Sequence, residues 1–174
     1  MRPILAAALV LAATPAAAAL SPGAKAPDFT TRGAVAGKVM RVRLADALRR
    51  GPVVLYFFPA AFTSGCNAEA RAFAEKIPAF RAAGATVIGL SADKVEDLQR
   101  FSATECAGRF AVASAGPRVV KGYDVARGKR TSRTSYVVAR DGRIAFVHDD
   151  PAPAQHVARA LAVVQRLART PRGA

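Results

Sequence analysis

Two apolar runs, at residues 53–58 (VVLYFF) and 85–91 (ATVIGLS), stand out from the rest of the chain. A run that is apolar at every position is typical of a strand buried on both faces, as in a sheet covered by helices. Residues 66–82, between the two runs, show the period of an amphipathic helix. A strand, a helix and a second strand at this spacing predict a right-handed parallel βαβ unit.

The helix predicted at 66–82 contains a proline, Pro78, which we expect to kink it because the ring removes a backbone hydrogen bond. Gly84 is expected to end it. The apolar stripe of this helix consists of Phe73, Ile77 and Phe80.

The segments before the first apolar run are more polar. Residues 38–44 (KVMRVRL) alternate between polar and apolar positions, which predicts an edge strand. Residues 44–51 predict a short helix that Gly51 ends. Residues 20–36 contain prolines, glycines and no helical period, so we expect an extended loop there.

The second half of the chain adds further helices and a hairpin. The turn residues Asp141 and Gly142 between two apolar segments are a strong hairpin signal. We therefore expect one domain over residues 20–174, an α/β fold of thioredoxin-like type with a mixed central sheet and helices on both faces. The elements predicted here are helices at 95–107, 119–123 and 151–168, the last with Val157, Leu161, Val164 and Leu167 inward, and strands at 134–140 and 143–148.

Residues 1–19 have the order of a cleaved secretory signal peptide. Arg2 precedes an apolar run at 4–13, and alanines after Pro15 offer a cleavage site near Ala19. The alternative is a membrane anchor, but the run is short for a span of about 20 residues. We expect export to a periplasmic compartment, without stable membrane insertion.

Charge and cysteine content narrow the function classes. The formal net charge is +14, but the basic residues are scattered and lack interleaved aromatics, so we expect no nucleic-acid site. An exported protein can form disulfides, and Cys66 and Cys106 allow one bridge. Their separation excludes a CxxC redox or zinc motif. His148 and His156 show no metal-ligand spacing, which favours surface or packing roles.

The turn after the first apolar run carries a distinctive motif, Pro59-x-x-x-Thr63-x-x-Cys66, which resembles the peroxiredoxin signature. The similarity extends over essentially all of the chain after residue 19. Segments that also resemble this family are 26–30 (APDFT), 85–93 (ATVIGLSAD), 133–144 (RTSYVVARDGRI) and 148–157 (HDDPAPAQHV), the last typical of the Q-type, or bacterioferritin-comigratory, subgroup.

The resemblance implies a thiol peroxidase that reduces hydrogen peroxide and organic hydroperoxides without a cofactor or metal. It implies that Cys66 is the peroxidatic nucleophile and that Thr63, Pro59 and Arg133 complete the catalytic site. A thiolate is the reactive form of cysteine, and the first turn of a helix stabilises negative charge through its free N–H groups. The resemblance also implies a thiol reductant as partner and, for the Q-type subgroup, a monomer.

The chain departs from its subgroup at the resolving position. Many Q-type relatives carry a second cysteine five residues after the first, where this chain has Arg71. Other members place it on the following helix, near Ser102, and Cys106 lies one turn further along. We expect Cys106 to resolve Cys66 as an intramolecular disulfide that a thioredoxin-like donor then reduces. The alternative is a one-cysteine enzyme in which Cys106 is a buried filler and an external thiol resolves Cys66.

Several other residues have weaker signals. Tyr56 and Phe57 are expected in the core, with the alternative that one of them lines the peroxide pocket, and Phe62 is expected to pack the active-site loop. Glu69 is expected either to orient the Cys66 loop, or pair with an arginine, or to be a surface acid. Asp149 and Asp150 are expected in a solvated loop or helix cap.

Two rival function classes stay open. One is an assembly protein such as a metallochaperone, although these usually need closely spaced cysteines. The other is a redox sensor, which would use the same chemistry at Cys66 but pass its oxidation to a partner protein.

Overall fold

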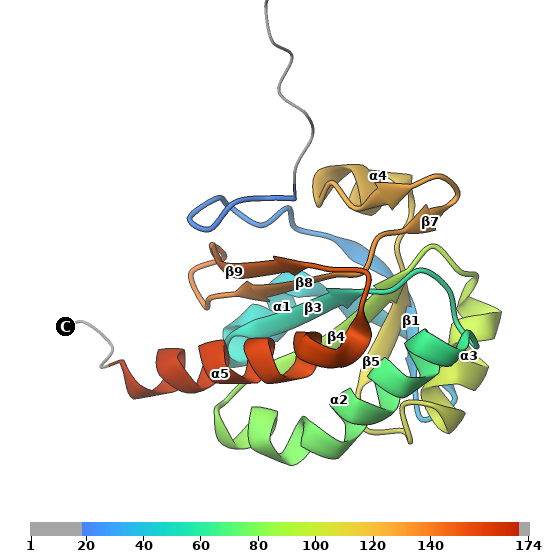
Figure 1. Ribbon diagram of the computed structural model, residues 1–174, viewed down its shortest axis with the longest axis horizontal. Helices are drawn as coiled ribbons and strands as arrows, with labels where there is room; N and C mark the ends of the chain where they lie inside the picture. The colour runs from blue at the N-terminus through green and yellow to red at the C-terminus, as the bar shows by residue number, and fades with distance from the viewer. Residues whose placement is uncertain (1–18, 171–174) are drawn as a thin grey trace, which may run out of the picture.

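The computed structural model describes residues 19–170, so the predicted signal peptide lies outside it except for Ala19. A mixed sheet of seven strands in the order β2-β1-β5-β4-β3-β8-β9 forms the centre (Figure 1). Its strands are β1 (Thr30–Val35), β2 (Lys38–Arg43), β3 (Val53–Phe57), β4 (Thr86–Ser91), β5 (Ala111–Ser114), β8 (Thr134–Val138) and β9 (Ile144–Asp149). The helices are α1 (Leu44–Arg50), α2 (Ser64–Ala82), α3 (Val95–Thr104), α4 (Pro117–Gly122), the 3-10 turn η1 (Pro153–Gln155) and α5 (His156–Arg169).

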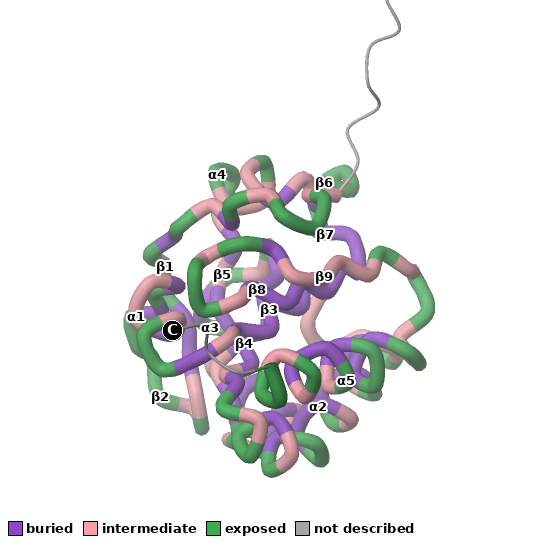
Figure 2. The backbone as a smooth tube through the Cα atoms, turned by 90° about the vertical axis from the view of Figure 1, so that its left-hand side faces the viewer, coloured by how far each residue is buried: buried purple, intermediate pink, exposed green. Residues whose placement is uncertain are grey.

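Strand β3 lies near the middle of the sheet, and every one of its residues is buried. It pairs in parallel with β4 and antiparallel with β8, which confirms the predicted βαβ unit. The hairpin of β8 and β9 turns through Gly142, whose φ of 83° is a conformation that glycine adopts without strain. In Figure 2 the buried positions concentrate along β3, β4 and β8.

Helices cover both faces of the sheet, as predicted. Alternate residues of β3 divide the interior into two apolar clusters. Tyr56 and Phe58 belong to the cluster under α2, α3 and α5, together with Cys66 and Cys106. Phe57 belongs to the cluster under α1 and α4. Both cysteines therefore lie on the same side of the sheet.

The predicted extended loop at 20–36 was wrong in part, because residues 30–35 form β1 and pair with β2 and β5. The residues of β1 do not alternate regularly between polar and apolar, because the strand needs a glycine at position 33. A Cβ added at Gly33 would lie 2.5 Å from the Val112 carbonyl oxygen, so only glycine allows this close pairing. Strand β5 and the two-residue strands β6 (Ala126–Arg127) and β7 (Arg130–Thr131) also went unpredicted, since such short segments carry little periodicity.

The boundaries of the predicted helices shift. Helix α5 begins at His156 instead of residue 151, because residues 153–155 form the separate 3-10 turn η1, and α4 begins at Pro117 instead of residue 119. Helix α2 begins at Ser64, two residues earlier than expected. Helix α3 ends at Thr104 instead of residue 107, because Ala107 and Gly108 have left-handed φ values of 48° and 66°. Cys106 therefore lies in a turn beyond the helix and not on it. No helix within residues 19–170 is long and apolar enough to cross a membrane.

Candidate active site

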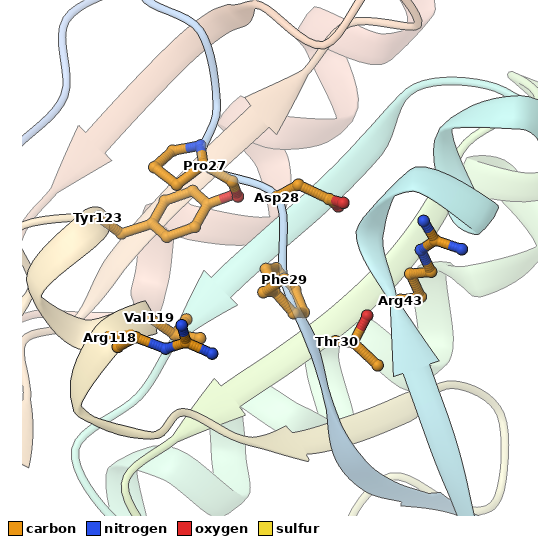
Figure 3. Close-up of a pocket in the computed structure, with 8 residues that line it drawn as sticks. All are labelled: Pro27, Asp28, Phe29, Thr30, Arg43, Arg118, Val119 and Tyr123. Carbon is orange, nitrogen blue, oxygen red and sulfur yellow. The ribbon is translucent and has the colours of Figure 1, made fainter.

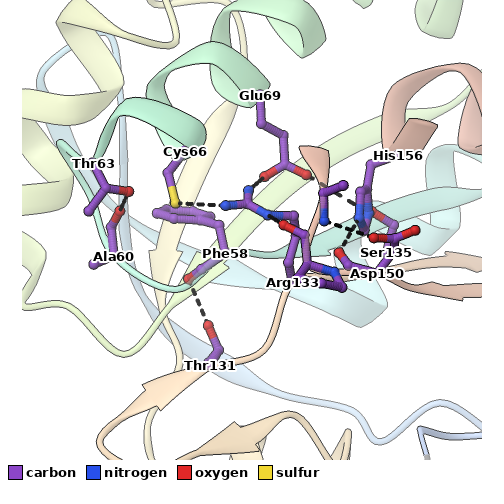
Figure 4. Close-up of polar contacts among 12 residues, drawn as sticks. Phe58, Ala60, Thr63, Cys66, Glu69, Thr131, Arg133, Ser135, Asp150 and His156 are labelled. Atoms are coloured by element: carbon purple, nitrogen blue, oxygen red, sulfur yellow. Dashed lines mark hydrogen bonds and ion pairs between the residues drawn. The ribbon is translucent and has the colours of Figure 1, made fainter. Parts of the chain in front are cut away.

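Cys66 lies in the first turn of α2, and its side chain is buried. Thr63 is the residue before the helix and has an extended backbone, so the helix N–H groups that follow have no partners from an earlier turn. The Cys66 Sγ atom accepts a hydrogen bond from Arg133 Nη2 at 3.5 Å (Figure 4). A sulfur in this position faces both the positive end of a helix and a guanidinium cation.

The loop that delivers Cys66 is held at several points. The Ala61 N–H donates to Asp93 Oδ2 at 2.7 Å, and the Phe58 carbonyl accepts from Thr131 Oγ1 at 2.7 Å. The Thr63 hydroxyl donates to the Ala60 carbonyl at 3.1 Å, which leaves its oxygen able to accept. Pro59, half-buried, follows Phe58 at the end of β3.

Phe62 has a left-handed backbone, with φ of 63°, and its side chain is 45% exposed. The ring meets Phe101 of α3 edge to face, with centroids 5.4 Å apart. The Arg100 guanidinium lies 5.8 Å from the ring centre. Phe62 therefore packs the active-site loop against α3, as expected, but one side of it faces solvent.

Arg133 lies immediately before β8, and the pairing of Thr134 with Phe57 brings it beside the end of β3. Its guanidinium donates to three partners: Nη2 to Cys66 Sγ, Nη1 to Glu69 Oε2, and Nε to the Pro151 carbonyl at 2.9 Å. Burial opposes its charge, but the Glu69 carboxylate and Cys66 together raise the pKa of Arg133. The guanidinium is thus charged and held in one orientation.

Glu69 lies one helical turn after Cys66 and is fully buried. Its expected role as a surface acid is wrong, and its expected pairing with an arginine is the arrangement found. Burial raises the pKa of Glu69 to about 7, against the opposing effect of Arg133. Its second oxygen, Oε1, has no hydrogen-bond partner among the described residues and lies 3.9 Å from His156 Nδ1.

His156 begins α5 and is fully buried, which agrees with the packing role given as one alternative; its place beside Glu69 was not predicted. Its Nδ1 is 2.8 Å from Ser135 Oγ, and its Nε2 is 2.9 Å from the Asp150 carbonyl oxygen. Burial lowers the pKa of His156, while the bond to Asp150 acts in the opposite direction. The inward stripe of α5 carried a usable signal, because His156 precedes the buried Ala160 by four residues.

Cys106 is also buried, and both cysteines are free. Burial raises the pKa of the Cys106 thiol well above its ordinary value, and the negative charge of Glu105 adds a smaller effect in the same direction. Arg71 of α2 pairs with Glu105 at 2.7 Å, with the arginine 65% and the glutamate 12% exposed. The residue at the alternative resolving position therefore ties α2 to the turn that holds Cys106.

Ser102, Asp149 and Asp150 make hydrogen bonds that hold neighbouring segments together. The Ser102 hydroxyl accepts from the Gly37 N–H and donates to the Gln99 carbonyl. Asp149 accepts from the Thr134 hydroxyl, and Asp150 accepts from the Ala152 N–H. Within residues 19–170 no three histidine, cysteine or acidic side chains are grouped so as to hold a metal ion.

A surface hollow of about 400 Å³ lies over β1 and α4 (Figure 3). Phe29 and Tyr123 of its lining belong to the apolar cluster opposite the one that contains Cys66. The hollow is therefore separate from the thiol site. Its lining consists of Pro27, Asp28, Phe29, Thr30, Arg43, Arg118, Val119 and Tyr123.

Comparisons with known proteins agree with this geometry. Residues 22–147 match the AhpC/TSA family. The chain is 30% identical over 152 residues to the chloroplastic peroxiredoxin Q of Oryza sativa subsp. japonica, which covers 85% of this chain and 68% of the relative. The crystal structure of peroxidoxin BcpB from Mycobacterium tuberculosis superposes with a TM-score of 0.77 at 29% identity, covering 86% of this chain and 98% of that one. A structure of peroxiredoxin Q from Xanthomonas campestris gives a TM-score of 0.69 at 25% identity, covering 79% and 91%.

Proposed function

The chain belongs to the AhpC/TSA family of peroxiredoxins and is a thiol peroxidase, and on this premise we propose that Cys66 is the residue that attacks the peroxide. The observation that carries the proposal is the hydrogen bond from the Arg133 guanidinium to the Cys66 sulfur at the beginning of α2. A cation and unpaired helix N–H groups on one sulfur favour the thiolate, which is the nucleophilic form.

In the first step the Cys66 thiolate attacks one oxygen of the peroxide, and the O–O bond breaks. The sulfur gains that oxygen and becomes a sulfenic acid, while the other oxygen leaves with the bonding pair and takes up a proton as water or an alcohol. The charge that develops on the leaving oxygen needs hydrogen-bond donors. Arg133 and the N–H groups of the helix's first turn supply them.

Thr63 and Pro59 shape the same site. With its own proton bound to the Ala60 carbonyl, the Thr63 hydroxyl oxygen can accept a hydrogen bond from the O–H of a bound peroxide. Pro59 contributes an apolar ring and no N–H, so it shields the thiolate without competing for the peroxide. Both residues belong to the loop between β3 and α2, which leads directly into the helical turn that contains Cys66.

In the second step Cys106 resolves the sulfenic acid. Its sulfur forms a bond to Cys66, the sulfenic oxygen leaves as water, and one intramolecular disulfide results. Two thiols of a thioredoxin-like donor then reduce this disulfide and are themselves oxidised. Because Cys106 is buried in a turn, this step requires the turn or the first turn of α2 to open, which is least costly at helix ends.

A second scheme is favoured by the burial of Cys106 and by the ion pair of Arg71 with Glu105, which holds that turn closed. In this scheme an external thiol attacks the Cys66 sulfenic acid, and Cys106 only packs the core.

Intact-mass analysis separates the two schemes. Wild type and Cys106→Ser are each treated with one equivalent of hydrogen peroxide and measured without reductant. An internal disulfide shows as a loss of two hydrogens in wild type, with a persistent sulfenic acid in Cys106→Ser. A persistent sulfenic acid in both proteins would support external resolution.

We also propose a compartment and an oligomeric state for the enzyme. The leader at residues 1–19 supports export to a periplasmic compartment, where the donor would be an exported thioredoxin-like protein. We propose a monomer, in line with the Q-type resemblance. Size-exclusion chromatography with light scattering and fractionation of cells expressing the full chain test these two points.

A further inference from the structure

The buried imidazole of His156 has a tautomer that its neighbours dictate. Its Nε2 lies 2.9 Å from the Asp150 carbonyl oxygen, which can only accept, so Nε2 must carry the proton. In the neutral ring Nδ1 is then an acceptor, and the Ser135 hydroxyl at 2.8 Å donates to it. His156 thus donates to one specific backbone carbonyl and is itself fixed by β8.

The backbone that His156 holds is the same backbone that orients Arg133. The Asp150 N–H donates to the Arg133 carbonyl at 3.2 Å, and the Pro151 carbonyl accepts from Arg133 Nε at 2.9 Å. The Asp150 carbonyl therefore connects His156 to a short segment that binds both the backbone carbonyl and the side chain of Arg133. Figure 4 shows His156, Asp150, Arg133 and Cys66 following one another across the site.

A second connection runs through Glu69. Its Oε2 accepts from Arg133, while its Oε1 lies 3.9 Å from His156 Nδ1 without a hydrogen bond. A ring protonated on Nδ1 would bind this carboxylate and compete with the guanidinium for it. A neutral ring leaves Glu69 to Arg133 alone.

We propose that His156, as a neutral ring, is a positioning residue for peroxide reduction, which holds the Asp150–Pro151 segment and thereby aims the Arg133 guanidinium at the Cys66 sulfur. The inference rests on the proposed role of Cys66. His156 touches neither the sulfur nor the peroxide, and it acts through Arg133.

The charges around the ring support its neutral state. Arg133, before β8, and His148 of β9, whose ring centre is 4.6 Å away, oppose a second proton. Glu69 of α2 and Asp150 are the acids that face it. Since burial is the largest effect and the Arg133 cation adds to it, the neutral ring is the form that the folded protein favours.

Three substitutions separate the contacts of the ring. His156→Phe keeps its volume and removes both polar atoms. His156→Gln places an amide N–H near the original Nε2, whereas His156→Asn places its amide near the original Nδ1. Arg166→Gln, at an exposed position of the same helix, is the matched control.

The readout is the second-order rate of Cys66 oxidation by hydrogen peroxide, measured by rapid quench and mass spectrometry, with a melting temperature for each variant. We expect His156→Phe to be slower by about 10- to 100-fold, since a small displacement of a positioned group has effects of this size. His156→Gln should recover most of the rate, His156→Asn should not, and Arg166→Gln should match wild type.

A double-mutant cycle shows whether His156 acts through Arg133. In an Arg133→Ala background, adding His156→Phe should change the rate by less than about twofold, because the group that it positions is gone. The proposal is overturned if His156→Phe is oxidised at the wild-type rate, if Gln rescues no better than Asn, or if the two substitutions are fully additive. Fast oxidation of wild-type Cys66 in the same experiment would leave the peroxidase assignment intact in each of these cases.

Discussion

Arg133 joins Cys66 to Glu69: one end nitrogen of its guanidinium lies 3.5 Å from the Cys66 sulfur, and the other donates to the Glu69 carboxylate one turn further along α2. A planar guanidinium bound at both ends and at Nε cannot rotate away from the sulfur. The site is therefore preorganised before any peroxide arrives, which is the condition for electrostatic stabilisation of a leaving oxygen.

Replacing Arg133 should slow the peroxide step and leave the fold in place. We expect Arg133→Ala to reduce the second-order rate of Cys66 oxidation by about 100- to 1,000-fold, as loss of a charge-stabilising donor does elsewhere. The oxidation rate of Arg133→Lys should lie between those of wild type and Arg133→Ala, because lysine keeps the positive charge but lacks the several N–H donors of the guanidinium. Arg127→Ala, at an exposed position of β6, is the control. Equal rates for Arg133→Ala and Arg127→Ala would contradict this role.

The Thr63 hydroxyl is predicted to act on the peroxide directly. Thr63→Val keeps the shape of the side chain and removes the oxygen, and we expect a loss of about 100-fold in the rate of oxidation by hydrogen peroxide. Thr63→Ser keeps the oxygen and should stay within about fivefold of wild type. A Thr63→Val protein as fast as Thr63→Ser would show that the hydroxyl only packs the loop.

Glu69 should make the stability of the protein depend on pH. Burial raises its pKa from an ordinary value of 4.5 to about 7. Between these values the folded state binds the proton more tightly than the unfolded chain, so the free energy of unfolding decreases as pH rises from 4.5 to 7. A shift of this size corresponds to on the order of 3 kcal/mol.

Glu69→Gln should lack this contribution, and urea denaturation from pH 4.5 to pH 8 measures it. The unfolding free energy of wild type minus that of Glu69→Gln should fall steadily as pH rises toward neutral, because glutamine resembles the protonated acid at every pH. Glu75→Gln, an exposed acid on the same helix, is the matched control. Parallel pH profiles for wild type and Glu69→Gln would refute the prediction.

The ion pair of Arg71 with Glu105 is predicted to restrain the turn that holds Cys106. The arginine is 65% exposed, so solvent screens the pair and it contributes about 1 kcal/mol, although the glutamate is only 12% exposed. Arg71→Ala should therefore open the turn about two- to fivefold more often. If opening limits disulfide formation, the Cys66 sulfenic acid should disappear faster by that factor, as followed by quenched mass spectrometry. Asp97→Asn removes a comparable pair on α3 and is the control. An unchanged rate in Arg71→Ala would mean that the turn is not restrained in this way.

Patterning along the chain predicted the parts of the fold with long, uniform signals. The βαβ unit, the β8–β9 hairpin and α5 were all predicted, because each has a continuous apolar run or a stripe at helical spacing. Strands β1 and β5 were missed since their burial depends on neighbours: Gly33 needs to be small only because the Val112 carbonyl lies against it.

The residues of the candidate site likewise fall into those that local sequence could predict and those that it could not. Cys66, Thr63 and Pro59 share one short motif, so local sequence was enough to place Pro59 and Thr63 on the loop and Cys66 at the beginning of the helix that follows. Arg133 could be proposed by resemblance, and the pairing of β8 with β3 brings it to the sulfur. The positions of Glu69 and His156 depend on how α5 packs against α2, and such contacts between distant helices leave no local pattern.

The central claim is that the Cys66 sulfur takes the oxygen from the peroxide. The chain contains no tryptophan, so chemical trapping is a more direct readout than fluorescence. Cys106→Ser is mixed with one equivalent of hydrogen peroxide, a sulfenic-acid reagent is added, and the labelled residue is identified by peptide mass spectrometry. We predict a single label on Cys66, together with no peroxide turnover by a folded Cys66→Ser protein supplied with a thiol donor. Peroxide turnover that survives in Cys66→Ser would contradict the account.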